Sequence, residues 1–413
     1  AIRAFRAIVP EQKDRIHINA DLDGLAYIPY MIIGYLPLWY MAYLARRPNT
    51  HFLRIMILPI AMLSAVASSC RYYFNSEPNI MLGLNWSTGL LALVGVGRAI
   101  RYAIPRKGIL KVGEIEPGLF KDGSTREQIV SWAPAWLYDS VELLATGRGL
   151  GWEFGEGVYI PPYNKPLERN AFLRATCLEF AKYFFTYDIL ETFLKLFPGV
   201  GSPEGGSMYY SNLAPVPRFL VATCIHSAMG YFVYAMFQLY YSLFALIGVG
   251  LCRSDPASWP PLFSSPLFCA SMHELWAQGW QQLLHPTFYV WGGYVGEMLF
   301  GRLGLLAGTF FASGLYHELS FYTVGRGLDS APFVFFMLQV PILQLERLWR
   351  QVTGKRVGGR AGHLWVLFIM FVVAQPMIDS WLKRGYAGCL MIPAVISPAR
   401  TLLRWLGYWP QAW

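Results

Sequence analysis

Long apolar runs separated by short polar stretches recur along the whole chain. A helix needs about 20 mainly apolar residues to cross the hydrocarbon core of a bilayer. Gly and Pro inside several of the runs predict helices that are tilted, broken or buried in protein. The run at 219–250 is either one long element or two broken ones. The predicted spans are 25–45, 52–69, 80–97, 219–250, 287–300, 303–323, 332–345 and 364–382.

The middle of the chain has a different pattern. Residues 100–170 are mixed in polarity and rich in Gly, Pro and Trp, which indicates interfacial helices and loops at the level of the lipid headgroups. Residues 170–197 predict a helix, and the Gly, Ser and Pro content of 199–217 predicts a mobile loop. No internal repeat is visible by eye. We therefore predict a single membrane domain over residues 1–413.

Composition supports an all-α, polytopic integral membrane protein of about 8–10 transmembrane helices. Of the 413 residues, 55% are hydrophobic and 14% charged, whereas soluble domains carry about 25% charged residues. The mean hydropathy is +0.35. A net charge of +9 is compatible with nucleic-acid binding. The Lys and Arg residues lie between apolar runs, however, and not along one soluble face, so a lipid bilayer is the predicted partner and nucleic acid is not.

Two ionisable residues inside apolar runs are candidates for chemistry. His317 lies in the run 303–323 and Glu297 in the run 287–300. Placing such a group in hydrocarbon costs about 2.5–3.5 kcal/mol, so these residues usually face a protein interior, a water-filled cavity or a reaction site. For Glu297 the alternatives are an ion pair with a buried Arg or the capping of a neighbouring helix.

Motifs for metal or nucleotide chemistry are missing from the sequence. It contains no CxxC, no HExxH and no phosphate-binding loop of the GxxxxGK[ST] type. We predict no metal site. Buried free thiols are the favoured interpretation of the six scattered cysteines, Cys70, Cys177, Cys224, Cys252, Cys269 and Cys389.

Four separated segments carry a resemblance to a known family. They are Thr146-Gly147-Arg148-Gly149-Leu150-Gly151-Trp152, then Trp259-Pro260-Pro261-Leu262-Phe263 with Glu274-Leu275-Trp276, then Ser313-Gly314-Leu315-Tyr316-His317-Glu318, and last Gln375-Pro376-Met377-Ile378-Asp379 before Arg384-Gly385. In order and spacing they resemble the wax-synthase-like branch of the membrane-bound O-acyltransferase (MBOAT) superfamily, particularly the fungal members that acylate secondary metabolites.

The resemblance implies a helical bundle around an internal tunnel in the endoplasmic reticulum or a similar internal membrane. His317 would be the family's catalytic histidine, in a tunnel where acyl-CoA meets a hydrophobic acceptor such as a terpenoid or polyketide. A general base that removes the acceptor's hydroxyl proton contributes roughly 10²–10⁴ in rate. Glu318 points about 100° away from His317 on a helix, so we expect it to pack or to support. The sequence does not set the oligomeric state.

One segment departs from the family pattern. Members of this branch usually have an aromatic-Trp-Gly-Arg-Arg-Trp-His-Gln-like run, whereas this chain reads Leu275-Trp276-Ala277-Gln278-Gly279-Trp280-Gln281-Gln282. Both tryptophans and the last glutamine are kept. The two basic positions have become Gln278 and Gly279, and the histidine has become Gln281. Cationic side chains hold phosphate or a developing oxyanion better than neutral amides do, so the departure weakens the case for ordinary CoA-dependent transfer.

The departure leaves two interpretations open. In the first, Gln281 or Gln282 positions the acceptor, because an amide can donate one hydrogen bond and accept another. In the second, the tunnel is kept but the enzyme cyclises or isomerises a terpenoid or polyketide, with aromatic rings shielding cationic intermediates. The acid would then be His317, Glu297, Asp188 or Glu318. The residues predicted to line the substrate site are Trp276, Trp280, Tyr316, Ser313, Glu297 and Asp188, with His317, Gln281 and Gln282 as catalytic residues.

A third hypothesis is a transporter or a binding protein without catalysis. Transporters often contain inverted repeats with paired broken helices, and none is visible in this sequence. Arg148 and Asp379 match recurrent family positions, and for Arg148 we favour a structural role in its loop.

Overall fold

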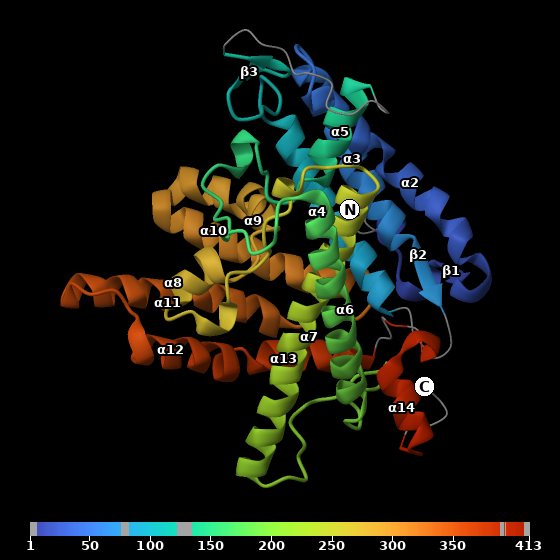
Figure 1. The fold of residues 1–413 in the computed structure, drawn as a ribbon, viewed down its shortest axis with the longest axis vertical. Helices are drawn as coiled ribbons and strands as arrows, with labels where there is room; N and C mark the ends of the chain where they lie inside the picture. The colour runs from blue at the N-terminus through green and yellow to red at the C-terminus, as the bar shows by residue number, and fades with distance from the viewer. Residues whose placement is uncertain (1–5, 76–81, 122–133, 389–391, 393, 409–413) are drawn as a thin grey trace. The chain divides into compact units, whose positions relative to one another are not determined.

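The structure, a computed structural model, describes residues 6–75, 82–121, 134–388, 392 and 394–408, and it is predominantly helical (Figure 1). Two short sheets pair β1 with β2 in parallel and β3 with β4 antiparallel. The prediction of an all-α membrane protein is confirmed. The helices are α2 (Ala20–Ala45), α3 (His51–Cys70), α4 (Leu82–Ala103), α5 (Ala135–Ala145), α6 (Arg169–Lys195), α7 (Pro215–Gly250), α8 (Met272–Glu274), α9 (His285–Phe288), α10 (Tyr294–Thr323), α11 (Ser330–Thr353), α12 (Gly359–Phe368), α13 (Gln375–Lys383) and α14 (Pro398–Trp405); the strands are β1 (Ile16–Asn19), β2 (Tyr72–Asn75), β3 (Glu114–Glu116) and β4 (Leu119–Phe120).

Five helical stretches in the described part of the chain are long and apolar enough to cross a membrane. A shorter apolar helix covers Ile32–Ala45. On α3 the side chains of Phe52, Met56 and Ile60 are 76%, 57% and 57% exposed. A stripe of large apolar side chains facing outward fits lipid and not water. The five stretches are His51–Cys70, Pro215–Gly250, His285–Thr323, Ser330–Thr353 and Gly359–Lys383, and the total of about 8–10 spans stays a prediction.

The apolar runs at 287–300 and 303–323 form two helical segments, as predicted. The first segment begins at residue 285, and the two follow each other without a loop between them. Non-helical backbone at Phe300 and Gly301, where φ is 57° at Gly301, reverses the chain. A Cβ atom at Gly292 would lie 2.1 Å from the carbonyl oxygen of Gly308, and one at Gly296 would lie 2.0 Å from that of Gly304. The two backbones therefore touch along paired Gly-x-x-x-Gly faces, which allow close approach because glycine has no side chain.

The run at 219–250 is a single helix, α7, which settles the alternative left open by the sequence. The chain divides into two compact units. The first contains Ala1–Asn75, Leu84–Val158 and Gln282–Leu328, and the second contains Ser76–Gly83, Tyr159–Gln281 and Asp329–Trp413. The single-domain organisation stays a prediction.

In the first unit, α2 packs against α3 and α5. Gly34 on α2 lies against Ser68 on α3, where a Cβ atom would come within 2.2 Å of the Ser68 Cβ. Small residues at this contact let the two helices approach closely. The core of this unit consists of Leu38, Met41, Ala42, Ala45, Ala61, Ala99, Tyr102, Ala103, Ile109, Leu143 and Trp152.

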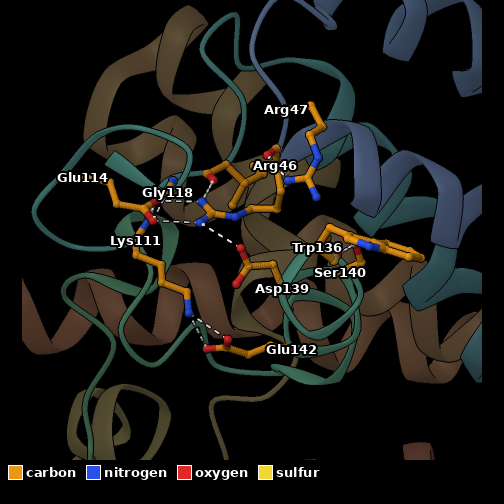
Figure 2. A network of polar contacts seen from close by, with 10 residues as sticks. Arg46, Arg47, Lys111, Glu114, Gly118, Trp136, Asp139, Ser140 and Glu142 are labelled. Atoms are coloured by element: carbon orange, nitrogen blue, oxygen red, sulfur yellow. Dashed lines mark hydrogen bonds and ion pairs between the residues drawn. The ribbon is translucent and has the colours of Figure 1, made fainter. Parts of the chain in front are cut away.

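A charged network closes one end of this core (Figure 2). Arg46, directly after α2, donates to both carboxylate oxygens of Glu114 at 2.6 and 2.7 Å and lies 3.6 Å from Asp139 on α5. Its guanidinium also stacks 5.0 Å from the ring of Trp152. Burial opposes ionisation of Glu114, but hydrogen bonds from Arg46 and from the backbone of Lys111 and Gly118 outweigh it and lower its pKa. These contacts tie the segment that contains Glu114 and Asp139 to the end of α2.

The second unit is built on α6 and α7, which run side by side (Figure 1). The predicted helix at 170–197 is confirmed as α6. Glu168 caps its start by accepting from the backbone N–H groups of Asn170 and Ala171, and these bonds lower the pKa of Glu168. The segment 199–217 connects the two helices, and its Met208 is buried with its N–H 2.8 Å from the Asp379 carboxylate. The mobility of this segment stays a prediction.

Candidate active site

His317 lies in the second half of α10. Its Nδ1 is 2.7 Å from the backbone carbonyl oxygen of Ser313, one turn earlier. A carbonyl oxygen can only accept, so Nδ1 carries the proton in this contact. In the neutral ring the basic lone pair then belongs to Nε2. The helix itself therefore sets the tautomer that a general base requires.

Aromatic rings surround the histidine within the first unit. The Tyr316 ring lies 5.4 Å from the His317 ring, and the Phe288 ring lies 5.4 Å from Tyr316 and 6.4 Å from His317. Trp291 packs edge-on to Tyr316 at 6.3 Å. Tyr316 is only 3% exposed. The His317 ring thus packs against the rings of Tyr316 and Phe288.

The turn after His317 is fixed by polar contacts inside the first unit. Ser320 donates to the carbonyl oxygen of His317 at 2.7 Å and accepts from Trp86 Nε1 at 2.9 Å. Ser313 and Glu318 are buried. These contacts hold the backbone on both sides of the histidine and limit the freedom of its ring.

Residues 275–281 of the run that departs from the family pattern lie in the second unit, where hydrogen bonds hold them in place. The run contains a π-helical turn, Leu275–Gly279, and such turns often occur at functional sites. Trp276 Nε1 donates to the side chain of Gln339 at 3.0 Å. The Glu346 carboxylate accepts from the backbone N–H groups of Met272 and His273 at 2.7 and 3.0 Å. Trp276 therefore has a structural partner in addition to its predicted substrate role.

Gln339 and Glu346 were not identified in the sequence. Both are buried and lie seven residues apart on α11, so they share a helix face. Two polar residues on one face of an apolar helix are the signal that points to them.

Trp280 forms part of an aromatic wall in the second unit. Its ring packs against Phe263 at 5.1 Å and Phe237 at 6.4 Å, both nearly edge-on. Phe263 ends the Trp259-Pro260-Pro261-Leu262-Phe263 motif, so this family-like segment meets the Leu275–Gln282 run here. The adjacent Gln281 and Gln282 are each 8% exposed.

The predicted site residues are divided between the two units. His317, Tyr316, Ser313 and Gln282 belong to the first unit, whereas Trp276, Trp280 and Gln281 belong to the second. Their convergence on one substrate stays a prediction.

Glu297 is exposed and accepts a 3.3 Å hydrogen bond from Tyr289, close to the chain reversal at Phe300 and Gly301. Asp188 is 1% exposed; it accepts from the Ser397 hydroxyl and, at 2.8 Å, from the Ala399 N–H. Asp188 thus caps the start of α14, and Arg400 is 3.9 Å away. For both residues a substrate-binding role stays a prediction.

Two further family-like positions are buried. Arg148 is 4% exposed, and Asp379 accepts from Ser207 and pairs with Lys383 at 2.6 Å. Among the cysteines, Cys70 and Cys269 are buried. The expectation of burial is wrong for Cys177, Cys224 and Cys252, which are exposed, and Cys389 lies outside the described residues.

The fold and these segments define a polytopic, all-α membrane protein. Residues 259–338 match the model of the membrane bound O-acyl transferase family, and this stretch includes both the Trp276–Gln282 departure and the His317 motif. The chain is similar to acetyltransferase ple2 from Rhodocybe pseudopiperita, with 22% identity over 280 residues that cover 63% of this chain and 67% of the relative. No solved structure matches. These findings support a membrane-bound acyltransferase at the level of the superfamily; the wax-synthase-like branch stays a prediction.

Proposed function

We propose that this protein transfers an acyl group, such as acetyl, from acyl-CoA to a hydroxyl group of a hydrophobic acceptor. The acceptor class is a terpenoid or polyketide secondary metabolite, and the membrane is the endoplasmic reticulum. The observation that carries the proposal is the hydrogen bond from His317 Nδ1 to the Ser313 carbonyl oxygen, inside the segment that matches the family. This bond leaves Nε2 as the proton-accepting atom.

The chemistry assigned to His317 is general-base catalysis. As the acceptor oxygen attacks the thioester carbonyl carbon, its proton passes to Nε2, a C–O bond forms and the C–S bond breaks. The protonated ring then returns the proton to the departing sulfur, so the products are the ester and free CoA. The Ser313 carbonyl oxygen stabilises the ring while it is positively charged, because it accepts from Nδ1–H throughout.

Gln281 is proposed to position the acceptor. The usual histidine is replaced here by an amide, which donates and accepts at once and can hold a hydroxyl group in line for attack. The aromatic residues Trp280 and Tyr316 supply apolar surface for the acceptor.

A second candidate is a cyclase or isomerase that no longer transfers acyl groups. It is favoured by the replacement of two basic family positions by Gln278 and Gly279, which removes groups suited to binding phosphate or an oxyanion. In this alternative a protonated His317 is the acid, and the surrounding rings shield the cation.

The two candidates differ in their need for a thioester. Purified protein in detergent is incubated with radiolabelled acetyl-CoA, or a longer acyl-CoA, and a panel of terpenoid and polyketide alcohols. Acyl transfer predicts labelled ester and stoichiometric release of free CoA. Conversion of a substrate at the same rate with and without acyl-CoA would instead establish the cyclase or isomerase.

A further inference from the structure

A buried polar cluster lies between α6 and α7 in the second unit. It consists of Tyr183, Tyr234 and Gln238 and is called the tyrosine–glutamine cluster below. Gln238 Nε2 lies 3.4 Å from the Tyr183 hydroxyl and 3.2 Å from the Tyr234 hydroxyl, and the two hydroxyls are 3.4 Å apart. Tyr183 and Gln238 are 6% and 9% exposed. Burying a polar amide at this depth in an apolar helix costs free energy, so such a residue is expected to serve a function.

The hydrogen bonds within the cluster do not use all of its polar atoms. When Nε2 donates to both hydroxyls and one hydroxyl donates to the other, one O–H donor and the Gln238 carbonyl acceptor are left over. When the amide is turned over, both hydroxyls donate to its oxygen, and two N–H donors and the hydroxyl lone pairs are left over. In the described part of the chain no other hydrogen-bond partner of these three groups occurs. In either arrangement the cluster therefore offers a free hydrogen-bond donor next to a free hydrogen-bond acceptor.

The cluster is continuous with the aromatic wall of the candidate active site. The Tyr234 ring lies 4.6 Å from Phe263, whose ring lies 5.1 Å from Trp280. Phe263 is buried, while Tyr234 and Trp280 are half-buried. An apolar molecule on this wall would reach the cluster with its polar end.

We propose that the tyrosine–glutamine cluster binds a hydroxyl group of the acceptor. An alcohol both donates and accepts one hydrogen bond, which matches the pair of atoms left over, whereas an ether only accepts. The inference rests on the proposed function for its assignment to the acceptor, and it adds the prediction that the site selects alcohols over ethers of the same skeleton. A cluster that only ties α6 to α7 has no such preference.

The test measures binding and not turnover. The full-length protein is placed in phosphatidylcholine nanodiscs, and saturable binding of tritiated farnesol is competed with unlabelled farnesol or with farnesyl methyl ether. The expected result is that farnesol competes about 5- to 10-fold better than its ether. This factor corresponds to the free energy of one net hydrogen bond. Tyr183→Phe, Tyr234→Phe and Gln238→Leu should each reduce this ratio to about one.

Tyr231→Phe is the matched control. Tyr231 lies one turn from Tyr234, stacks on it at 5.7 Å and is 41% exposed. Its variant should keep the full ratio. Tyr183→Phe and Tyr234→Phe keep the ring packing, so these two variants still test the inference if Gln238→Leu does not fold. Absence of saturable farnesol binding in the unsubstituted protein, or an unchanged ratio in the folded variants, overturns the inference. Alcohol selectivity without acyl transfer would reject the proposed function and the assignment to its acceptor, and would leave the cluster as a hydroxyl-binding site.

Discussion

Arginine side chains bind backbone carbonyl groups at helix ends in several places. Arg54 on α3 donates to the carbonyl oxygen of Tyr102 in the last turn of α4 and, at 2.7 Å, to that of Pro105 just after the helix. Arg169 donates to the last carbonyl groups of α7, at Val249 and Gly250. The last carbonyls of a helix lack partners within it and carry the negative end of its dipole. Some of the arginines that contribute to the net charge of +9 therefore stabilise the fold.

Glu114→Gln tests the buried ion pair with Arg46. Because its pKa in the folded protein is below the unfolded value, the ionised carboxylate stabilises the protein above the unfolded pKa, and this contribution is lost as the pH falls through the folded pKa. Removing the charge leaves Arg46 without its main partner, so the free energy of unfolding should fall by about 3–5 kcal/mol at neutral pH. The loss of stability with acid should also become shallower.

The measurement is the melting temperature in detergent between pH 7 and pH 4. Glu116→Gln is the control, because Glu116 lies on the same strand with an exposed side chain. Equal melting curves for the two variants at every pH would contradict the role given to Glu114.

Gln281 has a prediction of its own. Gln281→Ala should lower the rate of acyl transfer, because the acceptor loses the amide that orients it. Gln281→His should retain or raise activity, since it restores the residue usual in the family branch. The check is kcat and KM with one alcohol acceptor. If Gln281→Ala retains full kcat/KM, Gln281 does not position the acceptor.

At the scale of whole elements, the helical hairpin that reverses at Phe300 and Gly301 within α10 depends on direct backbone contact. Gly292→Ala should lower the free energy of unfolding by about 1–3 kcal/mol, since its Cβ would lie 2.1 Å from the Gly308 carbonyl oxygen and the helices must separate. Gly230→Ala on α7 is the control, because a Cβ there meets nothing within 4 Å. That change should be neutral or stabilising. Equal melting temperatures for the two variants in detergent would exclude a tight hairpin.

Hydropathy along the sequence predicts the positions of several helices. The separate runs 287–300 and 303–323 and the helix at 170–197 follow from the length and polarity of continuous segments, whereas hydropathy does not decide whether 219–250 forms one helix or two. The π-helical turns, including Leu275–Gly279, did not follow, because one extra residue in a turn depends on packing against other elements.

Site residues were harder to predict because a polar residue in an apolar run has several possible partners. Asp188 caps α14, and its partner Ser397 is 209 residues away in sequence, so no local pattern reveals the pair. Glu297 is exposed near a hairpin turn that hydropathy alone does not orient. His317 differs because its Ser313 partner is local, four residues earlier on the same helix.

At the scale of the whole molecule, the two enzyme hypotheses predict different electrostatics. CoA carries phosphates, so acyl transfer requires Lys or Arg side chains where the donor enters, whereas a neutral substrate does not. Raising the salt concentration should therefore increase KM for acyl-CoA and leave KM for the alcohol unchanged, because salt screens exposed charges. Steady-state kinetics at two ionic strengths are the check. An acyl-CoA KM that does not respond to salt would argue against a basic entrance.

The most direct test of the central claim is His317→Ala, with turnover and melting temperature measured on the same detergent-purified sample. If His317 is the general base, kcat should fall roughly 10²–10⁴-fold, while acceptor binding and melting temperature change little. If His317 is only a hydrogen-bonded packing residue, the melting temperature should fall and the activity per folded molecule should remain. Full activity in a well-folded His317→Ala protein would contradict the account.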